Sequence, residues 1–252
     1  MSPTAKTERD RAHPVIECFG PTIQGEGALA GRPTHFVRFG GCDFTCSWCD
    51  SSHAVLPAEV RKAEKLTAHE IATRVAGLPG NPDWVTLSGG NPLLHPLNFL
   101  VMRLHGFGFK VAIETQGSRW GDWVQNVDLI TISPKPPSSG MVNRDLDKFI
   151  AHLGGELIRP KVNLKVPIFS TEDLEFARRL HYKYFQFPFY LSVGTYMGGL
   201  YGDFDAGRID TQDDIVNRYR WLVDHIVGDP DFRDVAVFPQ LHALLWGHER
   251  GR

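Results

Sequence analysis

The chain has 252 residues, of which 42% are hydrophobic and 22% are charged, which is enough to bury one sizeable core. Its 27 Lys and Arg residues against 29 Asp and Glu residues give a formal net charge of −2, which argues against an electrostatic nucleic-acid binder. We expect no signal peptide, because the first residues are polar and charged, and no membrane span, because apolar runs are short. We expect a loose tail at residues 1–13 and a single domain at residues 14–252.

Short apolar strands alternate with amphipathic helices after this tail. Strands are predicted at Thr34–Phe39, Trp84–Leu87, Lys110–Glu114, Asp128–Ser133, Val162–Ile168, Tyr184–Leu191 and Val235–Phe238. Helices are predicted at Leu66–Val75, Pro96–His105, Asp145–His152, Glu172–Leu180 after a Thr171 cap, and from Thr211 or Asp213 to about Ile226. A Gly- and Asp-rich surface loop is expected at Gly194–Asp210. The alternation predicts βαβ units, a parallel sheet and an α/β fold.

Polar segments follow the apolar strand cores at five places along the chain. In parallel sheets the chemistry gathers where strands end and loops begin, so we expect these segments to line one site. They are the cysteine loop, Ser88–Asn91, Glu114–Gln116, Ser133–Lys135 and Pro239–His242.

Three cysteines, Cys42, Cys46 and Cys49, have the spacing Cys-x3-Cys-x2-Cys. Three thiolates on one loop can hold three irons of a 4Fe-4S cluster and leave the fourth iron open for another ligand, whereas most electron-transfer clusters have four cysteines. The alternatives are a zinc site or three buried thiols, but a second Cys/His pair typical of zinc sites does not follow. Three clustered thiolates also indicate a reducing cytoplasm, and Cys18 is expected to be a buried small hydrophobe.

Candidate cofactor contacts follow from this loop. Ser88 and Asn91 flank two glycines, which let backbone approach a ligand closely, although a tight turn or a phosphate loop are the alternatives. Trp48 either stacks on an adenine or packs the loop against the core. Ser133 precedes Lys135, whose ammonium either meets a cofactor carboxylate or is a solvated surface group.

Candidate substrate contacts lie upstream and at the end of the chain. Gln24 and Glu26, in a Gly-rich loop, suit hydrogen-bond donors on a flat heterocycle. Arg38, in an apolar strand, needs a partner, which is a substrate carboxylate or a core Glu. Asp50 and Ser51 form an oxygen pair of the kind that ligates Mg²⁺. His242 either holds substrate or a proton, or is structural.

The cysteine spacing resembles the signature of the radical S-adenosylmethionine (radical SAM) enzymes, and the whole pattern resembles the 7-carboxy-7-deazaguanine synthase family among them. The resemblance covers roughly residues 15–250. It is carried by Glu17–Gly27, Gly31–Pro33, Phe36–Phe39, Gly41–Asp50, Leu87–Pro92, Ile113–Gly117, Ser133–Lys135, Leu164–Val166 and Pro239–His242.

The resemblance implies a partial or modified TIM-like (β/α) barrel of the radical SAM type, usually a homodimer. It implies the conversion of 6-carboxy-5,6,7,8-tetrahydropterin to 7-carboxy-7-deazaguanine with loss of ammonia, in queuosine and deazapurine biosynthesis. A 5′-deoxyadenosyl radical abstracts hydrogen from the pterin, and Mg²⁺ assists the ring contraction. An external donor such as flavodoxin or ferredoxin supplies one electron.

Site residues carry over from the family motifs by position. Asn91 stands where many members have Glu, and Ser51 where they commonly have a Mg²⁺-binding Thr. The resemblance implies that the cluster ligands are Cys42, Cys46 and Cys49, and that the cofactor contacts are Trp48, Ser88, Gly90, Asn91, Glu114, Ser133 and Lys135. It implies that the substrate contacts are Ile23, Gln24, Gly25, Glu26, Arg38, Ser88 and His242. The implied catalytic residues are Ser51, Glu26 and Arg38.

Two rival functions remain open at this point. A glycyl-radical-enzyme activating protein is another short radical SAM protein, but its protein substrate would not need the Gln, Glu and Arg side chains. A binding module that uses the cysteines as a metal-stabilised fold clip is the non-enzymatic alternative.

Overall fold

The computed structural model describes residues 11–142, 145–153, 161–198, 208–247 and 249–251. Its centre is one nine-stranded sheet with the order β3-β1-β2-β4-β5-β6-β7-β8-β9. The strands are β1 (Ala12–Ile23), β2 (Pro33–Phe39), β3 (Glu64–Thr67), β4 (Trp84–Gly89), β5 (Lys110–Thr115), β6 (Leu129–Ile132), β7 (Lys161–Ile168), β8 (Phe189–Val193) and β9 (Ala236–Phe238).

The sheet has a parallel part and an antiparallel edge. From β2 through β9, neighbouring strands run parallel, which confirms the predicted α/β fold. At the edge, β1 pairs antiparallel with both β2 and β3, an arrangement that the sequence did not predict. Within the described residues no ladder joins β3 to β9, so the sheet stays open, as in a partial barrel.

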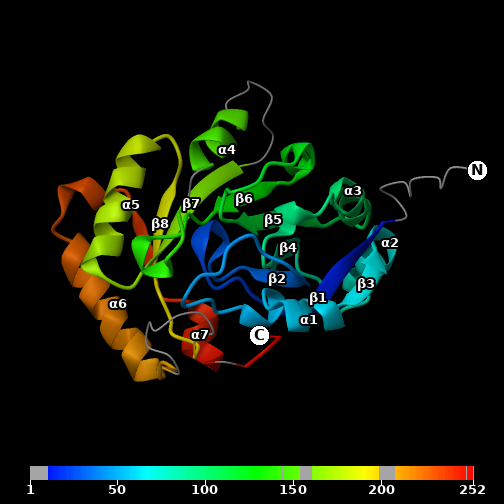
Figure 1. Cartoon of the computed structure of the whole chain (residues 1–252), viewed down its shortest axis with the longest axis horizontal. Coiled ribbons are helices and arrows are strands. Elements are labelled where there is room, and N and C mark those ends of the chain that lie inside the picture. The colour runs from blue at the N-terminus through cyan, green and yellow to red at the C-terminus, as the bar shows by residue number, and fades with distance from the viewer. Residues whose placement is uncertain (1–10, 143–144, 154–160, 199–207, 248, 252) are drawn as a thin grey trace, which may run out of the picture.

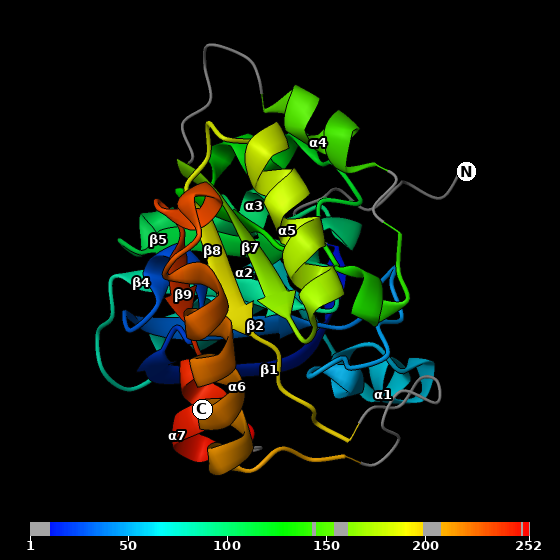
Figure 2. The same cartoon turned by 90° about the vertical axis from the view of Figure 1, so that its left-hand side faces the viewer.

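Helices surround the curved sheet, with the strands in the middle (Figure 1). Figure 2 shows α7 beside α6. None of the helices in the described part of the chain is long and apolar enough to cross a membrane. They are α1 (Pro57–Lys62), α2 (Ala68–Ala76), α3 (Asn98–Gly106), α4 (Leu146–His152), α5 (Thr171–Lys183), α6 (Gln212–Ile226) and α7 (Leu241–Trp246).

Burial on both faces explains the apolar runs in the central strands. Leu87, Ile113, Ile130 and Leu164 from β4 to β7 are fully buried in one hydrophobic core. Parallel strands covered on both faces read as continuous rather than alternating apolar segments. Each such side chain contributes about 1.5–3 kcal/mol by leaving water.

Three predicted boundaries were wrong. The segment Leu66–Val75 is not one helix, because its start pairs with β1 as β3 and Thr67 then caps α2 through a capping box with Glu70. Helix α5 is capped by Ser170 instead of Thr171. Because α5 continues to Lys183, β8 begins only at Phe189.

The structure differs from the expected tail and from the expected surface loop. Ala12 and His13 belong to β1, and His13 is buried, so the tail does not reach residue 13; residues 1–10 lie outside the described residues. In Gly194–Asp210, residues 199–207 also lie outside the described residues. The described ends of that segment are joined by an antiparallel bridge between Met197 and Ile209.

Candidate active site

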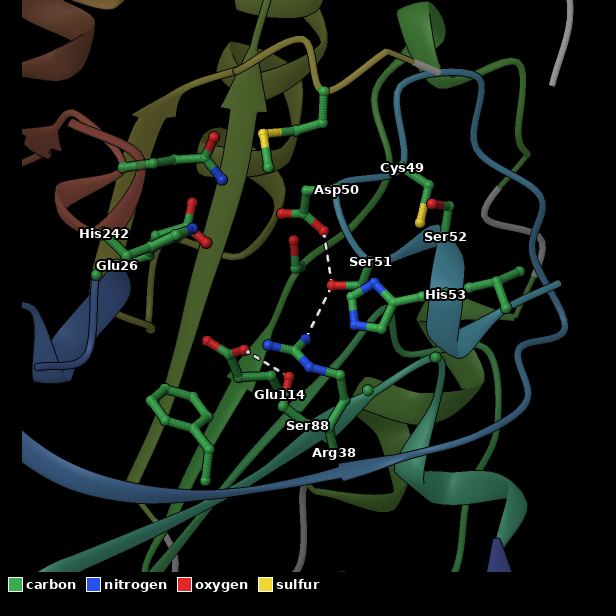
Figure 3. A pocket seen from close by; sticks show the side chains of 18 of the residues that line it. Glu26, Arg38, Cys49, Asp50, Ser51, Ser52, His53, Ser88, Glu114 and His242 are labelled. Atoms are coloured by element: carbon green, nitrogen blue, oxygen red, sulfur yellow. Dashed lines mark hydrogen bonds between the residues drawn. The ribbon is translucent and has the colours of Figure 1, made fainter. Parts of the chain in front are cut away.

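A cavity of about 430 Å³ lies where the ends of the parallel strands meet the cysteine loop, the segment Ile23–Glu26 and the start of α7. Concave sites of this size with a few converging polar groups are the usual form of small-molecule sites. In Figure 3, Glu26 and His242 lie on one side, Cys49 on the other, and Arg38 and Ser51 between them.

All three clustered cysteines line this cavity. Cys42 Sγ accepts from Phe44 N at 3.4 Å and from Gln116 Nε2 at 3.7 Å, contacts that suit a thiolate. Burial raises the pKa of the Cys46 thiol to about 11 and of the Cys49 thiol to about 12, so the free thiols hold their protons. In the part of the chain that the structure describes, no group of three His, Cys, Asp or Glu side chains is placed to hold one metal ion. Cysteines of a four-iron cluster each bind a different iron, so this donor set fits a cluster better than a zinc ion.

The cysteine loop is held to the sheet by Asp43. Its carboxylate accepts from Asn91 Nδ2 at 2.9 Å, Gln116 Nε2 at 2.7 Å, Ser118 Oγ at 2.8 Å and Arg119 Nε at 3.2 Å. Burial raises the pKa of Asp43, but these donors outweigh it and keep the pKa below its usual range. Asp43 is therefore an ionised anchor.

Asn91 does not reach the cavity. It is fully buried, its amide nitrogen donates to Asp43, and its oxygen accepts from Leu93 N at 3.2 Å and Thr115 Oγ1 at 3.1 Å. The amide is thus used within the fold, and the structure does not bring it together with the other predicted cofactor contacts.

Gly90 lines the cavity, and its position demands glycine. A Cβ there would stand 2.0 Å from Gly41 O, and one on Gly89, whose φ is +130°, would stand 2.2 Å from Phe39 O. The two glycines therefore let the end of β4 pass directly under the start of the cysteine loop.

Trp48 and Lys135 form the adjoining wall. The Trp48 indole packs against Phe169 with ring centroids 4.7 Å apart and donates to Ser138 Oγ at 3.0 Å. Lys135 Nζ lies 5.8 Å from the centre of the Trp48 ring and donates to Ser133 Oγ at 3.1 Å. Trp48 thus packs the loop while its side chain still reaches the cavity.

Arg38 links the antiparallel edge to the cysteine loop. Its Nε donates to Glu17 Oε1 at 2.6 Å. Its Nη1 donates to Ser51 Oγ at 2.9 Å, and Ser51 Oγ donates to Asp50 Oδ1 at 3.0 Å (Figure 3). Burial raises the pKa of Glu17, but hydrogen bonding to His53 and the charge of Arg38 lower it to about 2. Ser51 Oγ keeps one lone pair for a cation.

Glu114 is held between two predicted contacts. Its Oε1 accepts from Gln24 Nε2 at 3.1 Å and its Oε2 from Ser88 Oγ at 3.2 Å. Gln24 Oε1 in turn accepts from Glu26 N at 3.3 Å. Gln24 therefore uses its amide to connect the loop to β5 as well as lining the cavity.

Glu26 forms a buried ion pair. Its Oε2 accepts from Lys165 Nζ at 2.6 Å, with the two side chains only 8% and 9% exposed. Burial raises the pKa of Glu26, but Lys165 and His242 outweigh it and keep the pKa below its ordinary value. Gly25 makes room for His242, since a Cβ there would lie 2.1 Å from His242 Nδ1.

Every predicted site residue except Asn91 lines the cavity. Sequence reasoning did not single out Glu17, Asp43 or Lys165, although a core Glu was one of the two partners expected for Arg38. Lys165 carried a usable signal: a cation inside an apolar strand needs a partner, the argument that selected Arg38. The described ends of the Gly194–Asp210 segment, Met197 and Ile209, also reach the wall.

Known proteins resemble this chain in sequence and in fold. No family model matches the chain. The 7-carboxy-7-deazaguanine synthase of Bacillus cereus is 41% identical over 245 residues, which cover 94% of this chain and 98% of that protein. The synthase of Bacillus subtilis is 42% identical over 248 residues, with the same coverage.

Solved structures show the same fold at lower identity. The crystal structure of QueE from Escherichia coli has a TM-score of 0.65 at 22% identity and covers 92% of this chain and 95% of that chain. Streptococcus suis SuiB bound to S-adenosylmethionine has a TM-score of 0.52 at 12% identity and covers 81% of this chain and 50% of that chain.

Proposed function

The chain belongs to the 7-carboxy-7-deazaguanine synthase family, and from this premise we propose that its cavity converts 6-carboxy-5,6,7,8-tetrahydropterin to 7-carboxy-7-deazaguanine with loss of ammonia. The observation that carries the proposal is the convergence of the cysteine triplet with Glu26 and Arg38 on one cavity. Such a cavity pairs a cluster loop with polar groups suited to a flat, carboxylated heterocycle.

The cofactors would occupy the side of the cavity formed by the cysteine loop. Cys42, Cys46 and Cys49 would hold a 4Fe-4S cluster whose open iron binds S-adenosylmethionine. When bound, these groups supply a radical that takes hydrogen from the pterin. The neighbouring cofactor contacts are Trp48, Ser88, Gly90, Glu114, Ser133 and Lys135.

The chain's own residues bind and orient the substrate. Arg38 offers a guanidinium to the substrate carboxylate, and Glu17 fixes the direction of that guanidinium through Nε. Glu26 Oε1, which is buried and has no hydrogen-bond partner among the described residues, would accept from a ring N–H. His242, Gln24, Gly25 and Ile23 enclose the ring.

Magnesium belongs to the proposal as well. Ser51 Oγ beside Asp50 offers hard oxygen ligands, and Mg²⁺ there would act as a Lewis acid and template for substrate oxygens. The free lone pair on Ser51 and the second oxygen of Asp50 support this placement.

The surroundings of the enzyme follow from the same family. It acts on a small molecule and receives an electron from an external donor, for which flavodoxin or ferredoxin is suitable. We further propose a homodimer, tested by light scattering of the holoprotein, and a reducing cytoplasm, which keeps three clustered thiols available to iron.

Turnover tests the proposal directly. Anaerobically reconstituted protein, supplied with S-adenosylmethionine, Mg²⁺, a reductant and the pterin, should form 7-carboxy-7-deazaguanine. If the cluster is intact and this product does not form, the assignment of the substrate is rejected. The relatives do not favour the glycyl-radical activating alternative, and Glu26→Gln separates the two, since an activating enzyme would not respond to the loss of a ring-binding carboxylate.

A further inference from the structure

Lys165 lines the cavity and has no role in the function proposed above. It is the fifth residue of β7, between Leu164 and Val166, both fully buried in the core. Its ammonium donates to Glu26 Oε2 at 2.6 Å, across a sequence separation of 139 residues. Burial lowers the pKa of Lys165, but the acids around it outweigh burial and raise the pKa above its ordinary value.

The two carboxylate oxygens of Glu26 have different surroundings. Oε2 is occupied by Lys165, while Oε1 is buried and has no hydrogen-bond partner in the described part of the chain. The other titratable groups facing Glu26 are His242 from α7 and Asp50 from the cysteine loop, and Glu114 from β5 faces Lys165. Lys165 is thus the cation that contacts Glu26 directly.

We propose that Lys165 is a positioning residue that keeps Glu26 ionised and turned so that its free oxygen accepts a hydrogen bond from the substrate ring. This inference rests on the proposed function, because it assigns the ligand of Oε1 to the pterin ring. An unpaired carboxylate in this position would take up a proton, and the neutral acid would present one acceptor fewer. Lys165 itself touches neither the cluster cysteines nor Ser51 in the described contacts.

A double-mutant cycle in which probe binding is measured at several pH values tests the inference. The four holoproteins are wild type, Lys165→Met, Glu26→Gln and the double variant, with Lys165→Arg as rescue. Lys161→Met, an exposed position on the same strand, is the matched control. The probe is 6-carboxypterin, the air-stable oxidised analogue, titrated by fluorescence anaerobically with S-adenosylmethionine and Mg²⁺ present.

We expect Lys165→Met to weaken probe binding about tenfold or more near neutral pH, because one partner of a buried charge pair is lost. Binding by this variant should strengthen as the pH rises from about 6 to 9, since burial now raises the pKa of Glu26 and base restores the anion. In the Glu26→Gln background the same substitution should change binding by less than about twofold. Lys165→Arg should restore most of the affinity.

Two results would overturn the inference. One is an equal loss of probe affinity caused by Lys165→Met in the wild-type and Glu26→Gln backgrounds. The other is a pH dependence of probe affinity in Lys165→Met that runs parallel to that of wild type. If Lys165→Met alone does not fold, a folded double variant supports the inference, because it shows that the unpaired Glu26 carboxylate causes the unfolding. A double variant that also fails to fold overturns the inference.

The proposed function can fail separately. A wild-type holoprotein that neither binds 6-carboxypterin nor converts the pterin defeats that function. The unfolding free energies of the four proteins still measure the coupling between residues 26 and 165 without any ligand, and additive losses there contradict the pairing.

Discussion

The two sides of the cavity are built in different ways. We call Cys42, Cys46, Cys49, Ser88, Gly90, Ser133 and Lys135 the cofactor wall, and Glu17, Gln24, Glu26, Arg38, Lys165 and His242 the substrate wall. The cofactor wall consists of short runs at or just after the ends of parallel strands. The substrate wall depends on pairs that are distant in sequence, such as Glu26 with Lys165, and on the antiparallel edge formed by β1. Local motifs can be recognised in the sequence residue by residue. Pairs that are distant in sequence can be identified only when the strand register of the folded chain is known.

Removing a cluster ligand tests the cofactor wall with the largest expected effect. Cys46→Ala should abolish turnover and the absorption near about 400 nm that a thiolate-ligated iron cluster gives. Cys18→Ala, outside the cavity, is the control and should keep both properties. Turnover by Cys46→Ala at the wild-type rate would remove the cluster from this wall.

Gly90→Ala tests the close approach between β4 and the cysteine loop. Its Cβ would stand 2.0 Å from Gly41 O, so backbone must move, and we expect a loss of about 3 kcal/mol or more in unfolding free energy. Urea denaturation measures it. Gly106→Ala, at the end of α3 with no atom within 4 Å of its new Cβ, should change stability by no more than about 1 kcal/mol.

Asp43→Asn tests the anchor of the cysteine loop. The new amide nitrogen would replace one of the two acceptor oxygens and would face either the donors of Asn91 and Gln116 or those of Ser118 and Arg119. We therefore expect about 2 kcal/mol of lost stability and less iron retained per chain after gel filtration. Wild-type iron retention together with wild-type stability would show that the loop holds its shape without Asp43.

Glu17→Gln tests the substrate wall with a milder change. A looser Arg38 should raise KM for the pterin about tenfold with little change in kcat, because the guanidinium keeps its charge but loses its direction. An unchanged KM would show that Ser51 alone orients Arg38.

The same variant has a pH signature. The folded pKa of Glu17 is about 2 and the unfolded one about 4.3, so its stabilisation is complete above pH 4.3 and is lost as the pH falls toward 2. The loss amounts to roughly 3 kcal/mol at most. Urea unfolding of wild type between about pH 5 and 3 should show this decline, and Glu17→Gln should show less of it.

Prediction from sequence followed the same division between the walls. The position of Ser88, Gly90, Ser133 and Lys135 at the cavity could be predicted because each lies at or shortly after the end of a strand whose apolar run is visible in the chain. Asn91 does not line the cavity, and nothing in its motif reveals that Asp43 and Thr115 take its amide.

The edge of the sheet was harder to read. Strand β1 combines polar residues with register shifts, so it shows no clean alternation, and its partner β3 was absorbed into a predicted helix. Glu17 sits on that strand, which explains why a core Glu was expected as one possible partner of Arg38 without Glu17 being named.

The packing of His242 against Gly25, described above, bears on how the enzyme is assembled. Leu241 N donates to Gly25 O at 3.2 Å, which docks the start of α7 on the loop that carries Glu26. The ribosome completes the cysteine loop long before it reaches His242. The wall that carries Glu26 is therefore complete only after residues 240–242 have been added and α7 has docked on that loop.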